Sequence, residues 1–210
     1  MPEKRILLNK VDEIDPGDIR SYEAQGGFKA LKKALEMSPE EVIAEVKASG
    51  LRGRGGAGFP CGAKWELARK AAGETKYLIC NADEGEVGTF KDRYLLQKNP
   101  FALLEGMAIC ATAIGAKKAY IYLRAEYRYL LKGLQKAIDQ CKDKGYLKDL
   151  ELEIREGAGA YICGEESALM NSIEGKRGES RFRPPFPPTS GLFESPTIIN
   201  NVETLVNVPL

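Results

Sequence analysis

Short apolar segments and helical periodicities alternate along the chain. Residues 77–80 and 119–123 are unbroken apolar runs, which are typical of strands buried on both faces. Residues 150–154 alternate apolar with acidic positions and predict a strand at the edge of a sheet. Between these segments, apolar residues recur at helical spacing over 100–114 and 127–141. The order strand, helix, strand, helix, strand predicts crossover connections and a largely parallel sheet, so the fold class is α/β.

Helices are also expected on both sides of this central region. Apolar spacing predicts a helix over residues 28–37. The sequence Ser38-Pro39-Glu40-Glu41 is a capping box that opens a second helix, which should end at Gly50. Further helices are expected over residues 64–72, 165–173 and 200–208.

Two segments lack regular periodicity. Residues 1–26 are predicted to form an N-terminal leader, whose charged first part, up to about Ile19, should lie on the surface. Residues 27–210 should then form one domain with a helical start over residues 27–50. Residues 175–196 contain five prolines, which predicts a long ordered loop of the kind that carries function.

Composition excludes several kinds of chemistry. The chain has 31 Lys and Arg against 30 Asp and Glu, and a net charge of +1 gives no electrostatic basis for binding nucleic acid. It has no histidine, which excludes imidazole catalysis and histidine-ligated metals. The five cysteines lie far apart without a C-x-x-C pair, so we expect no metal site and no disulfide framework, but buried, reduced thiols in a cytoplasmic protein. No secretory signal or membrane-spanning apolar run is apparent, and we expect no direct membrane insertion.

The first segment with chemical potential is rich in glycine. Residues 50–62 contain six glycines and lead into an expected helix with Lys64 in its first turn. Bare backbone N–H groups at such a place suit an anion. The spacing matches neither the P-loop nor the usual dinucleotide motif. A flexible connector is the alternative, although Arg54, Phe59 and Lys64 are unusual linker residues.

The second segment is acidic. Asp83, Glu84 and Glu86 follow the strand at 77–80, and open α/β sheets bind ligands at the carboxyl ends of their strands. Asn81 lies at the same strand end. Acceptor groups there suit ribose hydroxyls, the N–H edge of a flavin or a carboxamide. A solvated acidic turn is the alternative.

Three further segments are candidates. Residues 156–167 place a glycine turn before Glu165 and Glu166 at a helix start, although a well-capped helix explains this pattern equally. The cations of the proline loop, with Phe186, suit a diphosphate and an aromatic ring, or they form a solvated basic loop. The last segment offers two amides and a hydroxyl that suit a phosphate or form a simple helix cap: Asn200, Asn201 and Thr204.

At these residues the chain resembles the NADH-oxidising flavoprotein subunit of respiratory complex I, and the diaphorase subunits of soluble NAD(P)-linked hydrogenases and formate dehydrogenases. The resemblance starts near Tyr22 and rests on five motifs in the family's order: GLRGRGGAGFP-x-G-x-KW, YLICNADE-x-E-x-GTFKDR, GAGAYICGEE-x-AL-x-NS-x-EG, RPPFP and INNVETL. It implies a Rossmann-like domain, with a largely parallel sheet flanked by helices, that binds FMN and accepts NADH.

The resemblance also assigns residues to each ligand. FMN would be held by Gly53, Arg54, Gly55, Gly56, Lys64, Asn81, Asp83, Glu84, Gly164, Glu165, Asn200, Asn201 and Thr204. NADH would be received by Phe59, Glu86, Tyr161, Glu166, Arg183 and Phe186, the aromatic rings by stacking. No side chain is expected to act as a catalytic acid or base, because hydride transfer from a nicotinamide to a flavin needs only that the two rings be placed together.

The sequence departs from the family's pattern in three ways. Leu67 and Arg183 stand where complex I members have an aromatic residue and a lysine, and Val87 replaces a proline. The family continues into a β-rich domain and a helical domain whose cysteines ligate a four-iron cluster. These parts are absent from this sequence, so no iron–sulfur cluster is expected in this chain.

The leading hypothesis is FMN-dependent NADH oxidation by the electron-entry module of a larger redox complex, with iron–sulfur electron-transfer subunits as partners. Carboxylates near the ribose favour NADH over NADPH, whereas Arg183 acts in the opposite direction. One alternative is a catalytically silent nucleotide- or flavin-binding scaffold that docks iron–sulfur subunits. Another is a phosphate-binding module unrelated to redox chemistry.

Overall fold

A four-stranded, fully parallel sheet forms the centre of the molecule. The computed structural model describes residues 5–9 and 11–210, so that residues 1–4 and 10 of the expected leader lie outside the described residues. The strand order is β3-β2-β1-β4, with β1 at Tyr77–Ala82, β2 at Lys118–Leu123, β3 at Glu151–Glu156 and β4 at Thr197–Asn201. The expected α/β class, the parallel sheet and the edge position of the third strand are confirmed.

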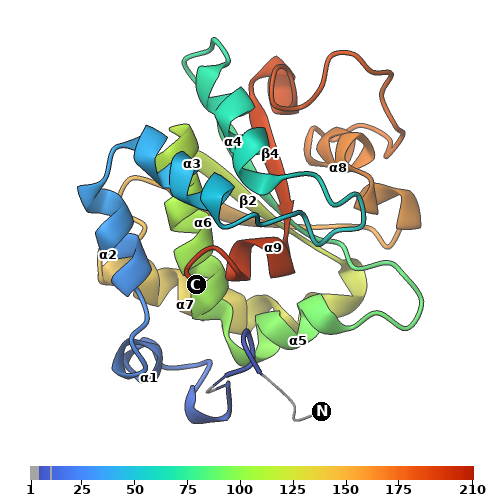
Figure 1. Cartoon of the computed structure of the whole chain (residues 1–210). Coiled ribbons are helices and arrows are strands. Elements are labelled where there is room, and N and C mark those ends of the chain that lie inside the picture. Colours follow the sequence, from blue (N-terminus) through green and yellow to red (C-terminus); the bar gives the residue numbers. More distant parts are fainter. Residues whose placement is uncertain (1–4, 10) are drawn as a thin grey trace, which may run out of the picture.

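Helices flank this sheet (Figure 1). The α-helices are α1 at Ile19–Ala24, α2 at Lys29–Glu36, α3 at Pro39–Ala48, α4 at Cys61–Lys70, α5 at Lys91–Lys98, α6 at Pro100–Ile114, α7 at Leu131–Asp143, α8 at Glu166–Ile173 and α9 at Val202–Val206. Short 3-10 helices occur at Val11–Glu13, Ala125–Leu130, Tyr161–Gly164 and Leu192–Glu194 (η1 to η4). The predicted capping box at Ser38 is present, with its hydroxyl accepting from the Glu41 N–H and the Glu41 carboxylate accepting from the Ser38 N–H.

Successive residues of β1 face two different cores. Leu78 and Cys80 belong to the larger core, to which residues of α1 to α7 and α9 contribute. Ile79 faces a smaller core on the other side, where Leu169 and Met170 of α8 contribute. This alternation follows from the two-residue period of a strand, and it explains why β1 has no polar position before Asn81 other than Tyr77.

Several elements differ from those expected. Residues 197–201 form β4, a strand that the sequence did not predict. The helix expected over residues 200–208 is shorter, and it is α9 at Val202–Val206. The helix α5 was not foreseen. The helix predicted from residue 127 begins at Leu131, because residues before it form η2, and α4 begins at Cys61 rather than at Lys64. β4 is short and ends in two amides, so its strand conformation depends on pairing with β1 rather than on a local pattern.

Close packing places α9 directly against α6. A Cβ atom on Gly106 of α6 would lie 2.0 Å from the carbonyl oxygen of Leu205 in α9. Only glycine permits this approach, which brings the end of β4 and the start of α9 down onto the core. Gly106 therefore contributes to the position of the last two elements.

The N-terminal segment is anchored in the core rather than lying on the surface. Val11, Ile14 and Ile19 are buried, so the expectation of a surface leader up to about Ile19 is wrong for these side chains. The anchor is Glu105 of α6, which is 2% exposed. Its carboxylate accepts hydrogen bonds from the Tyr22 hydroxyl at 2.6 Å and from two backbone N–H groups, those of Phe28 at 2.9 Å and Leu31 at 3.0 Å.

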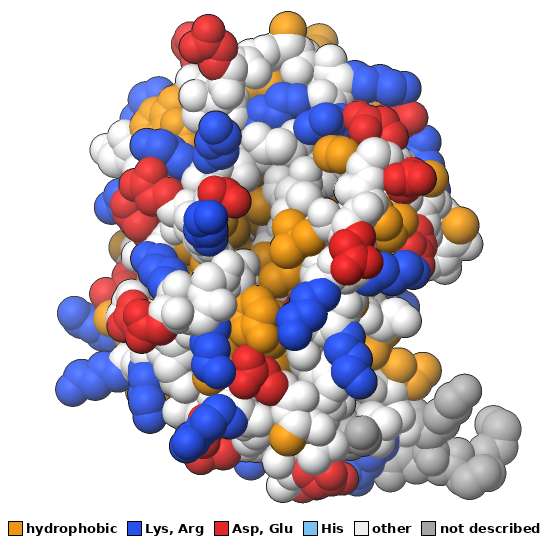
Figure 2. Space-filling view, turned by 90° about the vertical axis from the view of Figure 1, so that its left-hand side faces the viewer, with side chains coloured by type: hydrophobic (Ala, Val, Ile, Leu, Met, Phe, Trp, Pro, Cys, Tyr) orange, Lys and Arg blue, Asp and Glu red, His pale blue; other side chains and the backbone are white. Residues whose placement is uncertain are grey.

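The surface carries charges of both signs close together. Figure 2 shows Lys and Arg side chains interspersed with Asp and Glu side chains on one face, in agreement with the net charge of +1.

We predict that Glu105→Ala destabilises the fold by about 3 kcal/mol, because it leaves a hydroxyl and two backbone N–H groups buried without an acceptor. Urea unfolding monitored by circular dichroism measures the loss. Glu36→Ala is the control, since Glu36 is exposed at the end of α2, and it should change the free energy of unfolding by less than about 0.5 kcal/mol. Equal effects of the two substitutions would contradict the anchoring role.

Candidate functional site

The sheet reverses its strand order between β1 and β4. The chain proceeds from β1 outward to β2 and β3, and then returns to place β4 on the other side of β1. The carboxyl ends of β1 and β4 meet there, with Cys80 opposite Asn200 and Asn81 opposite Asn201. Crevices at such a reversal are the usual ligand sites of open α/β sheets. We call this region the strand-end site.

The end of β4 holds the glycine-rich loop in place. The Thr204 hydroxyl oxygen accepts from the Arg54 N–H at 2.8 Å, and the Asn200 side-chain oxygen accepts from the Trp65 indole N–H at 2.9 Å. A Cβ atom on Gly55 would lie 3.2 Å from the Asn201 Cβ, so the loop passes very close to the strand end. Asn200 and Thr204 are buried, and these contacts use them to position the loop and α4.

The loop presents free donors at this place. Gly53 donates to the Phe59 carbonyl at 2.9 Å, and the Arg52 Nε donates to the Gly58 carbonyl at 2.7 Å, which closes the loop on itself. Among the described residues, no acceptor is paired with the N–H groups of Gly55 and Gly56. Two adjacent unpaired backbone donors at an exposed bend suit an anionic ligand.

Lys64 extends from α4 toward the site. Its Nζ lies 2.8 Å from the Ile199 carbonyl oxygen and 3.3 Å from the Glu166 carboxylate, and its side chain is mostly buried. It therefore joins α4, β4 and α8 at one point. The sequence predicted Lys64 as a cation in the first turn of a helix and, through the resemblance, as a ligand of FMN. It did not predict the contact with β4, which is a finding of the tertiary structure.

The start of α8 carries two carboxylates and a paired arginine. Glu165 accepts from the N–H groups of Ser167 and Ala168 as the helix cap. Arg183, from the proline loop, forms ion pairs with both Glu165 and Glu166, the latter at 3.0 Å. Burial acts to raise the pKa of Glu165, but the hydrogen bonds from Ser167 and Ala168 and the Arg183 charge hold it below its usual value.

Asp83 has an unsatisfied carboxylate beside β1. The Asn81 amide donates to the Gly164 carbonyl at 2.9 Å and accepts from the Asp83 N–H at 3.0 Å, which ties β1 to η3. Within residues 5–9 and 11–210, the Asp83 carboxylate accepts no hydrogen bond, and partial burial raises the pKa of Asp83 to about 6. A half-buried acceptor without a donor suits an N–H group of a ligand.

Glu84 is placed differently from Asp83. Its carboxylate is buried and accepts from the N–H groups of Asp92 and Arg93, at 2.9 and 3.2 Å, and from the Tyr127 hydroxyl at 2.8 Å. It thus caps α5 and connects it to η2. Protein donors occupy this carboxylate, so a direct role of its side chain toward FMN stays a prediction.

A neighbouring network was missed by sequence reasoning. Asp92 is 2% exposed and accepts from Lys91 at 2.7 Å and from the Asn201 amide at 2.6 Å. Lys91 also reaches the Asn201 side-chain oxygen at 3.0 Å and Glu203 at 3.1 Å. Burial raises the pKa of Asp92. The network fixes the orientation of Asn201, and its only signal in the sequence was the GTFKDR motif.

Three exposed aromatic rings project from segments that adjoin the site. Phe59 belongs to the glycine-rich loop, Tyr161 to η3 and Phe186 to the proline loop. The Tyr161 hydroxyl donates to the Glu86 carboxylate at 2.8 Å. Figure 1 shows the glycine-rich loop, the segment after β1 and the segment before α8 on the same side of the molecule. Exposed rings beside acidic groups suit a ligand with planar rings and hydroxyls.

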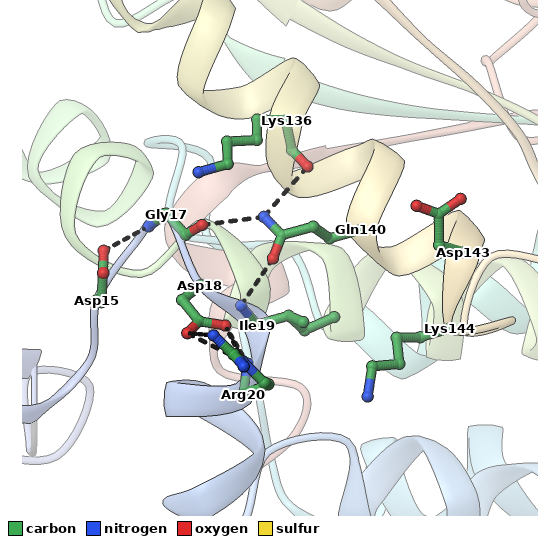
Figure 3. A pocket seen from close by; sticks show the side chains of 9 residues that line it. All are labelled: Asp15, Gly17, Asp18, Ile19, Arg20, Lys136, Gln140, Asp143 and Lys144. Atoms are coloured by element: carbon green, nitrogen blue, oxygen red, sulfur yellow. Dashed lines mark hydrogen bonds and ion pairs between the residues drawn. The ribbon is translucent and has the colours of Figure 1, made fainter.

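One hollow lies away from the strand-end site. It measures about 600 Å³ and is lined by residues of the N-terminal segment and α7 (Figure 3). Gln140 spans this hollow, accepting from the Ile19 N–H at 3.0 Å and donating to the Gly17 carbonyl at 3.1 Å, while Asp18 and Arg20 pair with each other. Because these polar groups bind one another, they are less available to a ligand than the unpaired groups of the strand-end site are.

Two features are absent from the described part of the chain. Among those residues, no helix is long and apolar enough to span a membrane. The same residues contain no group of three or more potential metal ligands among His, Cys, Asp and Glu. All five cysteines are free and buried, as expected.

Comparison with known proteins identifies the family. Residues 46–210 match the model of the Nuo51 FMN-binding domain. The chain belongs to this family.

Relatives of this FMN-binding domain are subunits of redox enzymes. It is 52% identical to a subunit of an NADH-quinone oxidoreductase from Rhizobium meliloti, over 97% of the chain and 51% of that protein. It is 49% identical to the HndC subunit of an NADP-reducing hydrogenase from Solidesulfovibrio fructosivorans, over 98% of the chain and 43% of that protein. The chain thus spans about half the length of the curated relatives it matches.

A solved structure shows the same fold. A chain of an air-oxidized NAD+-reducing [NiFe]-hydrogenase superposes with a TM-score of 0.84 at 47% identity, covering 98% of this chain and 34% of that chain. The Rossmann-like fold expected from the resemblance is therefore confirmed.

The FMN-binding domain brings most of the predicted residues to one region. Direct contacts around the ends of β1 and β4 join residues of every motif, namely Arg54, Gly55, Lys64, Asn81, Asp83, Gly164, Glu165, Glu166, Arg183, Asn200, Asn201 and Thr204. Gly53, Gly56 and Phe59 lie in the same loop as Arg54. Glu86 and Tyr161 form a separate exposed pair, Phe186 lies on the proline loop, and Glu84 faces the interior.

We predict that Asp83→Asn stabilises the flavin-free domain at pH 7.5 and has a smaller effect at pH 5. The folded pKa of about 6 exceeds the usual value of about 3.9, so the folded chain binds this proton more tightly than the unfolded chain. Ionised Asp83 therefore lowers the free energy of unfolding at pH 7.5, and this loss becomes smaller as the pH falls through about 6. Because Asp83→Asn removes the ionisable group, its stabilising effect is smaller at pH 5.

Thermal unfolding of both proteins at the two pH values tests this prediction. Asp149→Asn, at an exposed position, is the control and should leave the melting temperature unchanged at both. A pH-independent difference between Asp83→Asn and the parent chain would contradict the shifted titration.

Proposed function

We propose that this domain binds FMN at the strand-end site and oxidises NADH by hydride transfer to FMN. The observation that carries the proposal is the meeting of the glycine-rich loop, Lys64, Asp83 and the start of α8 at the reversal between β1 and β4. A diaphorase-type oxidoreductase is thus the function that the geometry supports best. This proposal extends to the whole protein only through its relatives, because the chain spans about half of their length.

The groups present fit FMN. The unpaired N–H groups of Gly55 and Gly56 suit a phosphate, and Lys64 offsets negative charge nearby. The Asp83 carboxylate, which lacks a protein donor among the described residues, suits a ring N–H group. When bound, FMN supplies a ring that accepts a hydride from a nicotinamide. The remaining residues position these contacts: Trp65, Asn200 and Thr204 hold the loop, and Asp92 orients Asn201.

NADH would lie against the exposed side of the site. Phe59, Tyr161 and Phe186 offer rings for stacking, while Glu86 and Glu166 accept hydrogen bonds from ribose hydroxyls. The negative charges of these carboxylates repel a 2′-phosphate. The charge of Arg183 is matched by two carboxylates, so it offers little to a 2′-phosphate unless those pairs break. We therefore propose NADH rather than NADPH as the donor.

We further propose that the domain is the electron-entry module of a larger cytoplasmic complex. Relatives are named as subunits of NADH-quinone oxidoreductases and of a hydrogenase. Hydride transfer leaves two electrons on one group. If these electrons are passed on one at a time, one-electron carriers must lie beside the domain. Iron–sulfur subunits are the proposed partners.

Titration of the flavin-free chain with FMN tests the cofactor. Saturable quenching of flavin fluorescence is expected, followed by anaerobic bleaching of the bound flavin on addition of NADH, faster than with NADPH. Absence of a flavin complex would overturn the cofactor assignment, and faster reduction by NADPH would overturn the donor assignment. Binding of FMN without bleaching by either nucleotide, and without NADH-dependent ferricyanide reduction, would instead identify a silent scaffold.

We predict that Lys64→Met weakens FMN binding by about tenfold or more, because it removes the mostly buried cation that joins β4 and α8 at the strand-end site. The same fluorescence titration measures the dissociation constant. Lys70→Met is the matched control from the exposed face of α4, where Lys70 pairs with Glu66, and it should bind FMN as the parent chain does. Equal affinities of all three proteins would exclude Lys64 from the FMN site.

A further inference from the structure

The proline loop between α8 and β4 has little regular structure to hold it. Residues 175–196 contain only the three-residue helix η4, yet they carry Arg183 and Phe186. The loop runs away from α8 and returns to the sheet at Thr197, so it has an outgoing and a returning arm. Its position relative to α8 needs specific contacts between the two.

Arg181 supplies contacts to both arms. Its backbone N–H donates to the Ser167 hydroxyl at 2.9 Å and its Nε donates to the Asn171 side-chain oxygen at 2.8 Å, both in α8. Its Nη1 donates to the Gly191 carbonyl at 3.0 Å on the returning arm. Its buried Nη2 forms an ion pair with Glu174 at 2.8 Å, without the alignment of a hydrogen bond. One guanidinium thus joins α8 to two distant parts of the loop.

Glu174 completes this connection. Its side chain is 5% exposed. Besides its ion pair with Arg181, it accepts hydrogen bonds from the Phe193 N–H at 2.9 Å on the returning arm and from Lys176 at 2.6 Å on the outgoing arm. The planar, always charged fork of arginine suits several fixed acceptors at once, which a lysine would not match. We call Arg181 and Glu174, with these contacts, the loop anchor.

Leu192 packs the returning arm into the smaller core, but the loop is not closely packed around Arg181. Hollows of about 410 and 430 Å³ lie beside Arg181, and its side chain lines both. The first extends under Phe182, Arg183 and Pro185, between the loop and α8. With open space beside it, the loop depends on the loop anchor more than a packed loop would.

The loop anchor lies close to the ligand-facing residues. Arg183 follows Arg181 by two positions and pairs with Glu165 and Glu166 at the start of α8. Ser167, which accepts from the Arg181 N–H, also donates to Glu165. A shift of Arg181 would therefore move Arg183 and Phe186 relative to α8. Among the described residues, no hydrogen bond or ion pair links Arg181 to the glycine-rich loop or to the ends of β1 and β4.

We propose that Arg181, through Glu174, is a positioning residue that holds the Arg183–Phe186 segment in the conformation that receives NADH, and that it has no direct part in binding FMN. The inference rests on the proposed function of the strand-end site. The cations of the proline loop were expected to contact a ligand, whereas this inference gives Arg181 the role of holding the loop in place.

The test uses the 210-residue chain reconstituted with FMN. Arg181→Met should raise the NADH concentration for half-maximal flavin reduction by about tenfold or more, with FMN affinity and the limiting rate of bleaching changed less than about twofold. Arg177→Met is the matched control, because Arg177 lies on the same loop, its side chain is 88% exposed and it pairs with the exposed Glu179; it should behave as the parent chain. Arg181→Lys should recover only part of the loss.

Two further measurements separate loop placement from general stability. Glu174→Gln should raise the same NADH concentration, and the double variant should be no worse than Arg181→Met alone, since both disrupt one connection. Chymotryptic cleavage after the exposed Phe182 should be at least about tenfold faster in flavin-free Arg181→Met than in the parent chain, and this readout needs neither ligand.

The outcomes distinguish the inference from the function it rests on. A parent chain that fails to bind FMN or to be reduced by NADH overturns the proposed function, whereas the cleavage rates still report on the loop anchor. A parent chain that is reduced by NADH, with Arg181→Met matching it in NADH dependence and in cleavage, overturns the positioning role. A lower melting temperature with unchanged NADH dependence would also overturn it.

Discussion

The parallel pairing of β4 with β1 is the constraint on which the rest of the site depends. By returning to the inner strand, the chain places Asn200 and Asn201 beside Cys80 and Asn81. This creates a reversal of strand order, the place where open α/β sheets usually bind ligands. Thr204, just beyond β4, accepts from Arg54, so the same pairing also fixes the glycine-rich loop. Gly106 permits the close approach of α9 that keeps this end of β4 on the core.

Carboxylates in this domain divide between structural and ligand-facing roles according to the donors that reach them. Glu84, Glu105 and Glu174 are buried and accept from two or more protein donors each, so that they hold helices and loops in place. Asp83 lacks such donors among the described residues, and desolvation therefore dominates its titration. Ionised carboxylates are costly to bury without partners, which makes the unpaired one the better candidate for a ligand contact.

The five motifs of the sequence differ in what they contribute. The glycine-rich and acidic motifs supply groups that face the strand-end site, whereas INNVETL mainly supports them: Asn200 accepts from Trp65, and Asn201 is fixed by Asp92 and Lys91. Motif residues of a type that often binds phosphate can therefore act indirectly. They position the loop that bears the free N–H groups instead of contacting the ligand. Arg181 is a comparable case in the proline loop.

The sequence by itself determined the α/β class, three of the strands, the capping box at Ser38 and the family. These features are encoded by local periodicity, short-range capping and motif order, and each is legible without knowing which distant segments meet. Only the tertiary structure decided that residues 197–201 form a strand, that the N-terminal segment is anchored on Glu105, and that Glu84 faces inward while Asp83 does not. Such features depend on hydrogen bonds between residues of different elements, and no local pattern specifies which donor a carboxylate will meet.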